Sequence, residues 1–256
     1  EPNLQNIPVR TELGSRLRAF FKAQPDCELV DADYSQIELR VLAHISQDEN
    51  MIAAFNSDED IHTNTAAQVF DMPPLFVTPE MRRKAKAVNF GIVYGIGAFS
   101  LSQDIGVSVA EADRYIKNYL DTFSGVRRYM EETVEFAQQH GYIETMFGRR
   151  RALPEIHSTN KNIVNFGKRV AMNTPIQGTA ADIIKIAMIR VNERLKAEHF
   201  RSRLILQVHD ELLVEAAKEE LDMVKQILAE EMHGAANLKV CLEIDMHTGE
   251  NWYEAK

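Results

Sequence analysis

The segment LILQVHDELLVEA, residues 204–216, constrains the fold most, because it combines the apolar composition of a buried strand with two adjacent acids at its centre. As one continuous strand it would place Asp210 on the same face as Leu206 and Val208, where an ionised carboxylate costs several kcal/mol unless a partner compensates it. If His209 and Asp210 instead form a two-residue turn, the segment becomes a hairpin whose tip is open to solvent or a metal ion. A plain polar turn and a metal site are both compatible with these residues.

Composition limits the class of protein. With 256 residues and 45% hydrophobic content, the chain can bury a substantial core. It contains no apolar run near the roughly 18 residues of a membrane span, so we expect no membrane partner. Its two cysteines, Cys27 and Cys241, lack the spacing of a zinc site and indicate a reducing, cytoplasmic setting.

The charge balance argues against a protein that coats nucleic acid by bulk charge, because the formal net charge is −9. Any anionic partner must therefore be bound by local basic clusters. These clusters comprise Arg10, Arg16, Arg18 and Lys22, then residues 82–86, then residues 148–151 with Lys161, Lys168 and Arg169.

The pattern of apolar residues predicts more helices than strands. Residues 27–33 predict a strand that ends at Asp33, followed by a helix through Ile37 and Val41. Thr78 and Pro79 have the pattern of an N-cap and first turn, which predicts that a long helix begins there. Further helices are expected at 107–123, 126–141, 174–199 and 215–232, further strands at 204–216 and 238–245, and a hairpin at 141–153.

Asp33 and Asp210 could meet at one edge of a shared sheet, since each follows or interrupts a predicted strand. Paired carboxylates are hard oxygen ligands for Mg²⁺, and two ions about 3.5–4 Å apart can stabilise both the attacking and the leaving oxygen of a phosphoryl transfer. Asp33 would serve equally well as the N-cap of the helix that follows it. The residues alone leave both hypotheses open.

A second pattern lies in residues 79–95, where Arg82, Lys86, Phe90 and Tyr94 recur every four residues. On a helix each such step rotates about 40° and rises about 6 Å, so the four side chains form one slowly turning stripe. Cations suit phosphates, and aromatic rings suit a base or a sugar. The alternatives are a solvated face for the cations and a core stripe for the aromatics.

Three motifs resemble those of family A DNA polymerases, the DNA polymerase I group: DYSQIELRVLAH matches motif A, RRKAKAVNFGIVYG motif B, and QVHDE motif C. Intervening strings such as PNLQNIPVRTELG and MNTPIQGTAADIIK match as well, so the resemblance covers essentially the whole chain. It implies an α+β right-hand fold with an antiparallel palm sheet and mainly helical fingers. The palm would comprise residues 1–41 and 161–256 and the fingers residues 42–160, with the thumb outside this chain.

The resemblance also implies template-directed DNA synthesis, in which two magnesium ions assist transfer of a deoxynucleotide to a primer 3′-hydroxyl with release of pyrophosphate. Asp33, Asp210 and the Tyr34 carbonyl would bind the ions, and Glu211 would be a neighbouring catalytic acid. Glu38 would crowd the sugar 2′ position. The implied nucleotide-binding residues are Ser35, Gln36, Glu38, His62, Arg82, Lys86, Phe90 and Tyr94, and the implied DNA-binding residues are Arg10, Arg150, Arg169, Asn173, Gln177 and His209.

Two other classes compete with this interpretation. A two-metal nuclease could use the same acids but needs no cation-aromatic helix, and a non-catalytic DNA-binding module needs no paired acids. The expected partners are primer-template DNA, deoxynucleoside triphosphates and an upstream, thumb-containing piece of the same polypeptide. We expect a cytoplasmic, nucleoid-associated protein of bacterial type, and poor primer extension by these residues alone.

Overall fold

The computed structural model describes residues 3–7, 11–57 and 60–256, and it divides into two compact units. Unit 1 comprises Glu1–Ile37, Ala180–Asn237 and Leu242–Lys256, and unit 2 comprises Glu38–Thr179 and Leu238–Cys241. Within the described ranges no helix is both long enough and apolar enough to cross a membrane. The architecture is α+β, as the sequence predicts.

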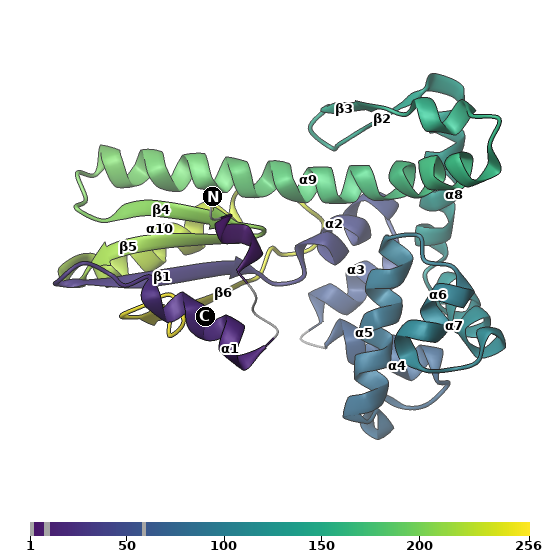
Figure 1. The fold of residues 1–256 in the computed structure, drawn as a ribbon, viewed down its shortest axis with the longest axis horizontal. Coiled ribbons are helices and arrows are strands. Elements are labelled where there is room, and N and C mark those ends of the chain that lie inside the picture. The colour runs from purple at the N-terminus through teal and green to yellow at the C-terminus, as the bar shows by residue number, and fades with distance from the viewer. Residues whose placement is uncertain (1–2, 8–10, 58–59) are drawn as a thin grey trace. The chain divides into compact units, whose positions relative to one another are not determined.

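Unit 1 is built on a four-stranded antiparallel sheet (Figure 1). The spatial order of its strands is β4 (Arg203–Val208), β5 (Glu211–Ala217), β1 (Cys27–Tyr34) and β6 (Ile244–Gly249). Because β1 lies between β5 and β6, its carboxyl end meets the start of both neighbours, and Asp33 pairs in register with Glu211 and with Asp245. The sheet therefore brings acids from three strands to one edge.

One face of this sheet is covered by α10 (Leu221–His233), which packs against β1, β5 and β6. The apolar spacing predicted for this helix is confirmed, since Val224, Ile227 and Leu228 are fully buried. The Tyr34 hydroxyl points to this face and donates to the Met232 carbonyl at 2.7 Å. Alternation along β1 consequently turns Asp31 and Asp33 to the opposite face.

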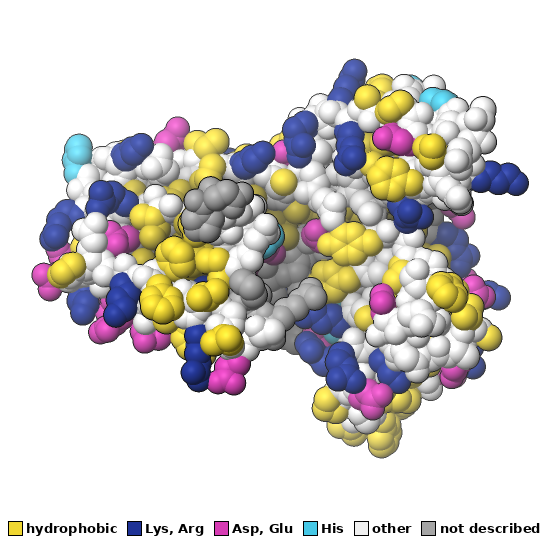
Figure 2. Space-filling model, viewed as in Figure 1, with side chains coloured by type: hydrophobic (Ala, Val, Ile, Leu, Met, Phe, Trp, Pro, Cys, Tyr) yellow, Lys and Arg dark blue, Asp and Glu magenta, His cyan; other side chains and the backbone are white. Residues whose placement is uncertain are grey.

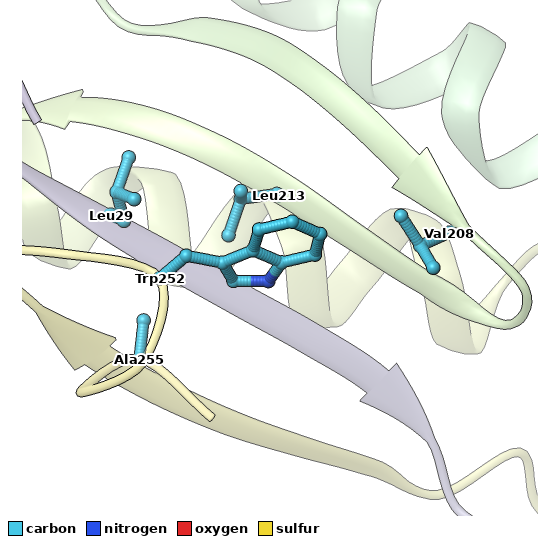
Figure 3. Packing of buried hydrophobic residues seen from close by; sticks show 5 residues of the cluster. All are labelled: Leu29, Val208, Leu213, Trp252 and Ala255. Carbon is cyan, nitrogen blue, oxygen red and sulfur yellow. The ribbon is translucent and has the colours of Figure 1, made fainter. Parts of the chain in front are cut away.

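The opposite face carries a separate apolar cluster around Trp252, which lies over the sheet and is fully buried (Figure 3). Leu29, Val208 and Leu213 project from three strands toward the indole, and Ala255 packs beside it. Burial of a tryptophan side chain contributes several kcal/mol. The cluster therefore fixes the last turn of the chain against the acid-bearing face of the sheet.

Unit 2 is helical apart from one small hairpin, as far as the described residues show. Its helices are α2 (Ile37–Ser46), α3 (Glu49–Asn56), α4 (Ile61–Val69), α5 (Pro79–Val93), α6 (Ala98–Ile105), α7 (Val109–Thr122) and α8 (Ser124–His140). The hairpin pairs β2 (Tyr142–Glu144) with β3 (Arg150–Ala152). Close packing around α8 requires Gly125, because a Cβ there would come within 2.8 Å of the Asp48 backbone.

Most predicted elements are confirmed, including the N-cap at Thr78, the end of α8 at Gly141 and the two-residue turn between β4 and β5. The helix predicted from residue 174 instead begins earlier, because α9 (Lys161–Ala197) continues through Pro175. Proline removes one helical donor, and the Thr174 hydroxyl donates to the Val170 carbonyl at 2.7 Å beside that position. A short α1 (Glu12–Ser15) precedes β1.

The strand predicted at 238–245 is wrong for its first six residues, because β6 begins only at Ile244. In residues 238–243, which precede β6, backbone groups instead form hydrogen bonds with side chains from α2 and α3. Arg40 donates to the Cys241 carbonyl at 2.6 Å, Asn56 donates to the Lys239 carbonyl, and the Lys239 amide donates to His44. These bonds satisfy polar groups that a strand would have paired with a neighbouring strand.

Candidate functional site

The β4–β5 turn brings the predicted pair of acids together in unit 1. His209 adopts a left-handed conformation with φ of 50°, which closes the tight turn. The Tyr34 amide then donates to the Asp210 carbonyl at 3.2 Å, which fixes the turn against the end of β1. Asp33, Asp210 and Glu211 thus gather at one sheet edge from positions 177 residues apart, counted from 33 to 210.

The electrostatics of this edge indicate an excess of negative charge. Burial, followed by the charge of Asp33, raises the pKa of Asp210 to about 6. Burial, followed by the charge of Glu211, raises the pKa of Asp31 to about 7, and this side chain is only 2% exposed. Carboxyl pKa values rise in this way where the ionised forms lack sufficient compensation, so the cluster favours a cation.

Two side-chain cations contact these acids. The Lys256 ammonium donates to Asp33 Oδ2 at 2.8 Å and also to Glu211 Oε2. Burial lowers the pKa of Lys256, but its hydrogen bonds to Asp33 and Glu211 outweigh that effect and raise it. On the other side, Arg18 Nη1 lies 3.6 Å from Glu211 Oε1, and its guanidinium stacks 4.1 Å above the Trp252 ring.

The acids fit a hard divalent cation in their chemistry. Asp33 Oδ1 and Glu211 Oε1 are buried and have no hydrogen-bond partner among the described residues, so ligand oxygens remain at the edge. Within the same residues, no group of three or more His, Cys, Asp or Glu side chains is arranged so that it could hold a metal ion by itself. The cluster is therefore compatible with an open site that shares a metal ion with a substrate.

The turn after β1 holds the two polar residues that precede α2. The Ser35 amide donates to the Glu243 carbonyl at 2.9 Å. Gln36 has a left-handed φ of 55°, and its buried Oε1 has no hydrogen-bond partner in the described part of the chain. A strained residue with an unsatisfied oxygen beside the acids is consistent with a binding role.

The second group of predicted residues lies in unit 2, on α5. The Thr78 hydroxyl accepts from the Met81 amide at 3.3 Å, and Pro79 occupies the first turn, which together start the helix. The helix ends at Val93, so Gly95 lies beyond it with φ of 66°. The chain then folds back over Gly91, where a Cβ would come within 2.7 Å of Ile96 Cγ2.

The cationic end of the α5 stripe carries its own counter-ion. Arg82 binds Asp60 through two hydrogen bonds, from Nε at 2.6 Å and from Nη2 at 3.0 Å, and its side chain is 47% exposed. Burial opposes ionisation of Asp60, but the hydrogen bonds from Arg82 and Thr63 lower its pKa to about 2. Lys86 is exposed, and its ammonium lies 5.9 Å from the centre of the Phe90 ring.

His62 lies beneath this stripe rather than on the surface, with 2% of its area exposed. The Asn89 amide nitrogen contacts His62 Nδ1 at 2.9 Å, and Asn89 Oδ1 accepts from Thr65 at 3.1 Å. Burial lowers the pKa of His62 to about 4, so the ring is neutral at pH 7. Because an amide nitrogen can only donate, Nδ1 is the acceptor and Nε2 carries the proton.

The aromatic end of the stripe borders a hollow of about 620 Å³, lined by Phe90, Tyr94, Gly95 and Arg169 among others. The Tyr94 hydroxyl donates to Glu38 Oε2 at 2.8 Å, which joins the start of α2 to the end of α5. The hollow has aromatic, charged and backbone groups in its wall. Such a wall suits a planar base with polar edges.

The predicted DNA-binding residues fall into separate groups. Arg169, Asn173 and Gln177 are spaced by four along α9 in unit 2, and the Asn173 amide lies 3.5 Å from the Tyr94 carbonyl. Arg150 is exposed on the β2–β3 hairpin, where it stacks 4.6 Å above Tyr142. His209 is exposed at the turn in unit 1. Arg10 lies outside the described residues.

Sequence patterns missed the contacts that four residues make with these groups. Lys256 and Arg18 bind the acids of unit 1, and Asp60 and Asn89 bind the polar residues of unit 2. Asp60 had a usable signal, because it precedes a helix and its side chain caps the Thr63 amide at 3.0 Å. For Lys256 the sequence carries no local signal.

Comparisons with known proteins place these observations in a family. The model of "DNA polymerase family A" matches residues 1–254. The chain is 54% identical to DNA polymerase I of Bacillus caldotenax and 54% identical to that of Bacillus subtilis (strain 168), in both cases over 100% of the chain and 29% of the relative. The chain thus spans less than a third of the length of these relatives.

A solved structure agrees with the sequence relatives. It is the POL domain of Pol1 from M. smegmatis in complex with DNA primer-template and dNTP, and its sequence is 46% identical. The match has a TM-score of 0.95 and covers 99% of this chain and 45% of that one.

Proposed function

Because the chain belongs to DNA polymerase family A, we propose that it carries the nucleotidyl-transfer site of a DNA-directed DNA polymerase. The observation that carries this proposal is the β4–β5 turn, which holds Asp210 beside Asp33 at the end of β1. Unit 1 corresponds to the palm in this proposal and unit 2 to the fingers. The exact domain limits, 1–41, 42–160 and 161–256, remain predictions.

Asp33, Asp210 and the Tyr34 carbonyl would hold two Mg²⁺ ions, with Glu211 as a neighbouring acid. When bound, these ions supply Lewis-acid stabilisation of the primer oxygen and of the leaving pyrophosphate. The protein positions the carboxylates by strand register, and it keeps Asp210 partly buried so that an incoming cation gains more from neutralising it. Ser35 and Gln36 border the same edge and would contact the nucleotide.

The α5 stripe would bind the deoxynucleoside triphosphate. Arg82 and Lys86 match phosphate oxygens, and Arg82 would exchange its two hydrogen bonds with Asp60 for bonds to phosphate. His62 would support this end of the site as a neutral Nε2 donor rather than as a cation. At the other end, Phe90 and Tyr94 would face the sugar and base, and Glu38 would crowd the 2′ position.

Primer-template DNA would contact the remaining set. Arg169, Asn173 and Gln177 form one line on α9, and Arg150 offers an exposed guanidinium on the hairpin. Arg150 and Arg169 are local cations in a chain whose net charge is −9, so this set would position the duplex rather than bind it by bulk attraction. His209 and Arg10 complete the proposed set.

An upstream piece of the same polypeptide is the second partner we propose. The relatives are more than three times as long as the 256 residues, and unit 1 exposes an apolar surface on α1 and the 3₁₀ helix after it. Leu13 is 81% exposed, Leu17 46% and Phe20 82%, and Figure 2 shows hydrophobic side chains over this segment. Such a surface favours cover by another part of the polypeptide, for which a thumb-containing piece is our candidate.

Primer extension tests the proposal. A labelled primer annealed to a longer template would be incubated with Mg²⁺, four deoxynucleotides and either the 256-residue chain or the full-length polypeptide that contains it. We expect template-directed lengthening by the full-length polypeptide and little by the chain alone. Shortening of the primer would instead indicate a nuclease, and a mobility shift without any reaction would indicate a DNA-binding module.

A further inference from the structure

Lys256, the last residue of the sequence, lies where the acids of unit 1 would otherwise receive an external cation. Its ammonium contacts Asp33 and Glu211 together, at 2.8 Å from Asp33 Oδ2. Asp33 is a proposed metal ligand, and Glu211 is its partner in strand register. An ammonium bound to the same carboxylates satisfies part of the charge that a metal ion would neutralise.

The position of this ammonium is set by packing that lies one to four residues before it. Trp252 and Ala255 lie against the sheet (Figure 3) and are fully buried. The Trp252 amide donates to the Phe21 carbonyl at 2.9 Å. Phe21 also meets the indole edge-on, with ring centres 5.6 Å apart. The backbone of this segment is therefore held against the sheet, and Lys256 reaches the acids from a fixed base.

The ammonium of Lys256 lowers the net negative charge of the acid cluster. Asp31, Asp33, Asp210, Glu211 and Asp245 carry five formal negative charges when ionised, and Lys256 and Arg18 carry two positive charges, which leaves a formal charge of −3. Without Lys256 this charge would be −4. A neighbouring cation weakens the binding of a metal ion to the same carboxylates, because like charges a few ångströms apart repel.

We propose that Lys256 is the internal counter-ion of the metal-free site, competing with the metal ion for Asp33 and Glu211 and moving away from them when the metal binds. This inference rests on the proposed metal site at Asp33 and Asp210. It assigns to Lys256 a positioning role: the residue keeps the carboxylates together in the absence of metal and sets how tightly a metal binds before any substrate is present.

The first test is a calorimetric titration of Mn²⁺ into the protein without nucleotide or DNA. Lys256→Met keeps the length of the side chain and removes its charge, so we expect Mn²⁺ binding to tighten by about tenfold or more. Lys256→Arg should restore affinity close to that of the parent protein. The matched control is Lys218→Met, which removes an exposed lysine of unit 1 that pairs with Glu28 at 4.0 Å, and it should leave the affinity unchanged.

Equal Mn²⁺ affinity in the parent protein and Lys256→Met would overturn the inference. Asp33→Asn separates that result from failure of the proposed metal site, because it should abolish binding irrespective of Lys256. If Asp33→Asn leaves Mn²⁺ binding intact, the metal site itself is misplaced. If Asp33→Asn abolishes binding and Lys256→Met has no effect, only the competition is wrong.

A second measurement uses the unaltered protein and so does not depend on the folding of a variant. Amines held in ion pairs acylate slowly, and peptide mass spectrometry can follow acetylation of each lysine with and without saturating Mn²⁺. We expect the metal to accelerate acetylation of Lys256 severalfold and to leave Lys218 unaffected. A rate for Lys256 that stays constant or falls on addition of metal would contradict its displacement.

Discussion

The two units of the molecule arrange charge in opposite ways. Unit 1 gathers acids on a partly buried sheet edge, where burial and then the charge of Asp33 raise the pKa of Asp210 to about 6. Unit 2 places Arg82 and Lys86 along an exposed helix face, where they suit an anion. Each unit also supplies an internal counter-ion, Lys256 for the acids and Asp60 for Arg82.

In the proposed function, the difference would let one chain provide separate groups for a metal ion and for a polyphosphate. Burial strengthens the attraction between the acids and a bound cation, because solvent screens their charges less there. Exposure makes the helix face accessible, and the Asp60 pair holds Arg82 in one geometry until an anion replaces the carboxylate. The following changes test this contrast, from the largest expected effect to the smallest.

Removal of an acid from unit 1 should have the largest effect on activity. Asp33→Ala or Asp210→Ala should lower primer extension by the full-length polypeptide by about a thousandfold or more, because several kcal/mol of transition-state stabilisation are lost. Asp210→Ala should also keep or raise the melting temperature without metal, since it relieves repulsion from Asp33. Unfolding of both variants would show that the acids are structural.

Removal of a cation from unit 2 should act on the nucleotide rather than on the metal. Arg82→Ala should weaken deoxynucleoside triphosphate binding by about 10- to 100-fold, as expected for a lost charge-assisted hydrogen-bonded contact. Arg83→Ala is the matched control, because Arg83 is an exposed neighbour on the same helix. Single-turnover kinetics would give the nucleotide affinity of both variants. An equal loss of affinity in each would show that the positive charge of the helix matters and the position of Arg82 does not.

Glu38 should affect sugar selection without affecting metal affinity. Glu38→Ala should raise the ratio of ribonucleotide to deoxynucleotide incorporation by about tenfold, because it removes bulk near the 2′ position. Glu38→Gln retains that bulk and a partner for the Tyr94 hydroxyl, so its ratio should stay close to that of the parent protein. The comparison is made in parallel extension reactions, and an unchanged ratio in Glu38→Ala would exclude Glu38 from the sugar contact.

The Asp60 counter-ion should have a smaller effect of the opposite sign. Asp60→Asn keeps an oxygen that can cap the Thr63 amide but weakens the pair with Arg82, so triphosphate affinity should rise by roughly two- to fivefold. Nucleotide titration monitored by fluorescence would detect this change. A drop in affinity would show instead that Asp60 positions Arg82 for the phosphate.

The smallest expected effect is on the pH dependence of folding stability, to which Asp31 of unit 1 and His62 of unit 2 contribute with opposite sign. Asp31 has a pKa of about 7 in the folded chain and about 3.9 when unfolded, so its contribution to stability is complete below about pH 4 and is lost as the pH rises to about 7. His62 has a folded pKa of about 4 against about 6.5 unfolded, so stability is lost as the pH falls between those values.

Two variants separate these contributions in thermal melts of the metal-free protein at about pH 7.5 and about pH 5. The measured quantity is the melting temperature at the higher pH minus that at the lower pH. Asp31→Asn should raise this difference by a few degrees, and His62→Asn should lower it. A shift of the same sign in both variants would contradict the contrast between the units.

Local patterns were sufficient to predict much of the fold. A short apolar run predicted β1, the cost of burying two acids indicated the break at His209 and Asp210, and capping residues predicted the start of α5 at Thr78 and Pro79. The grouping of Asp33 with Asp210 followed from the expectation that both strands share a sheet. These features depend on residues close together in the sequence or on regular strand pairing.

The remaining features depend on contacts that no local pattern encodes. Lys256 reaches Asp33 across 223 positions, and Arg18 meets Trp252 only because the chain returns over the sheet. The segment before β6 is apolar enough for a strand, yet Arg40 takes one of its carbonyls. Pro175 has the pattern of a helix start, but α9 had already begun at Lys161. Each of these features depends on contacts with residues that are distant in the sequence.

The two-residue turn at His209 and Asp210 also limits how such sequences can diverge. The turn fixes the register of β4 with β5, in which Val208 pairs with Glu211, so an insertion or deletion of one residue would force a one-residue shift between these two strands or a different loop geometry. Substitution preserves that register, whereas a change of length does not. In a library built by random mutagenesis, we therefore expect active clones to keep Asp210 and the length of the turn, and to accept substitution at His209 more often than at Asp210.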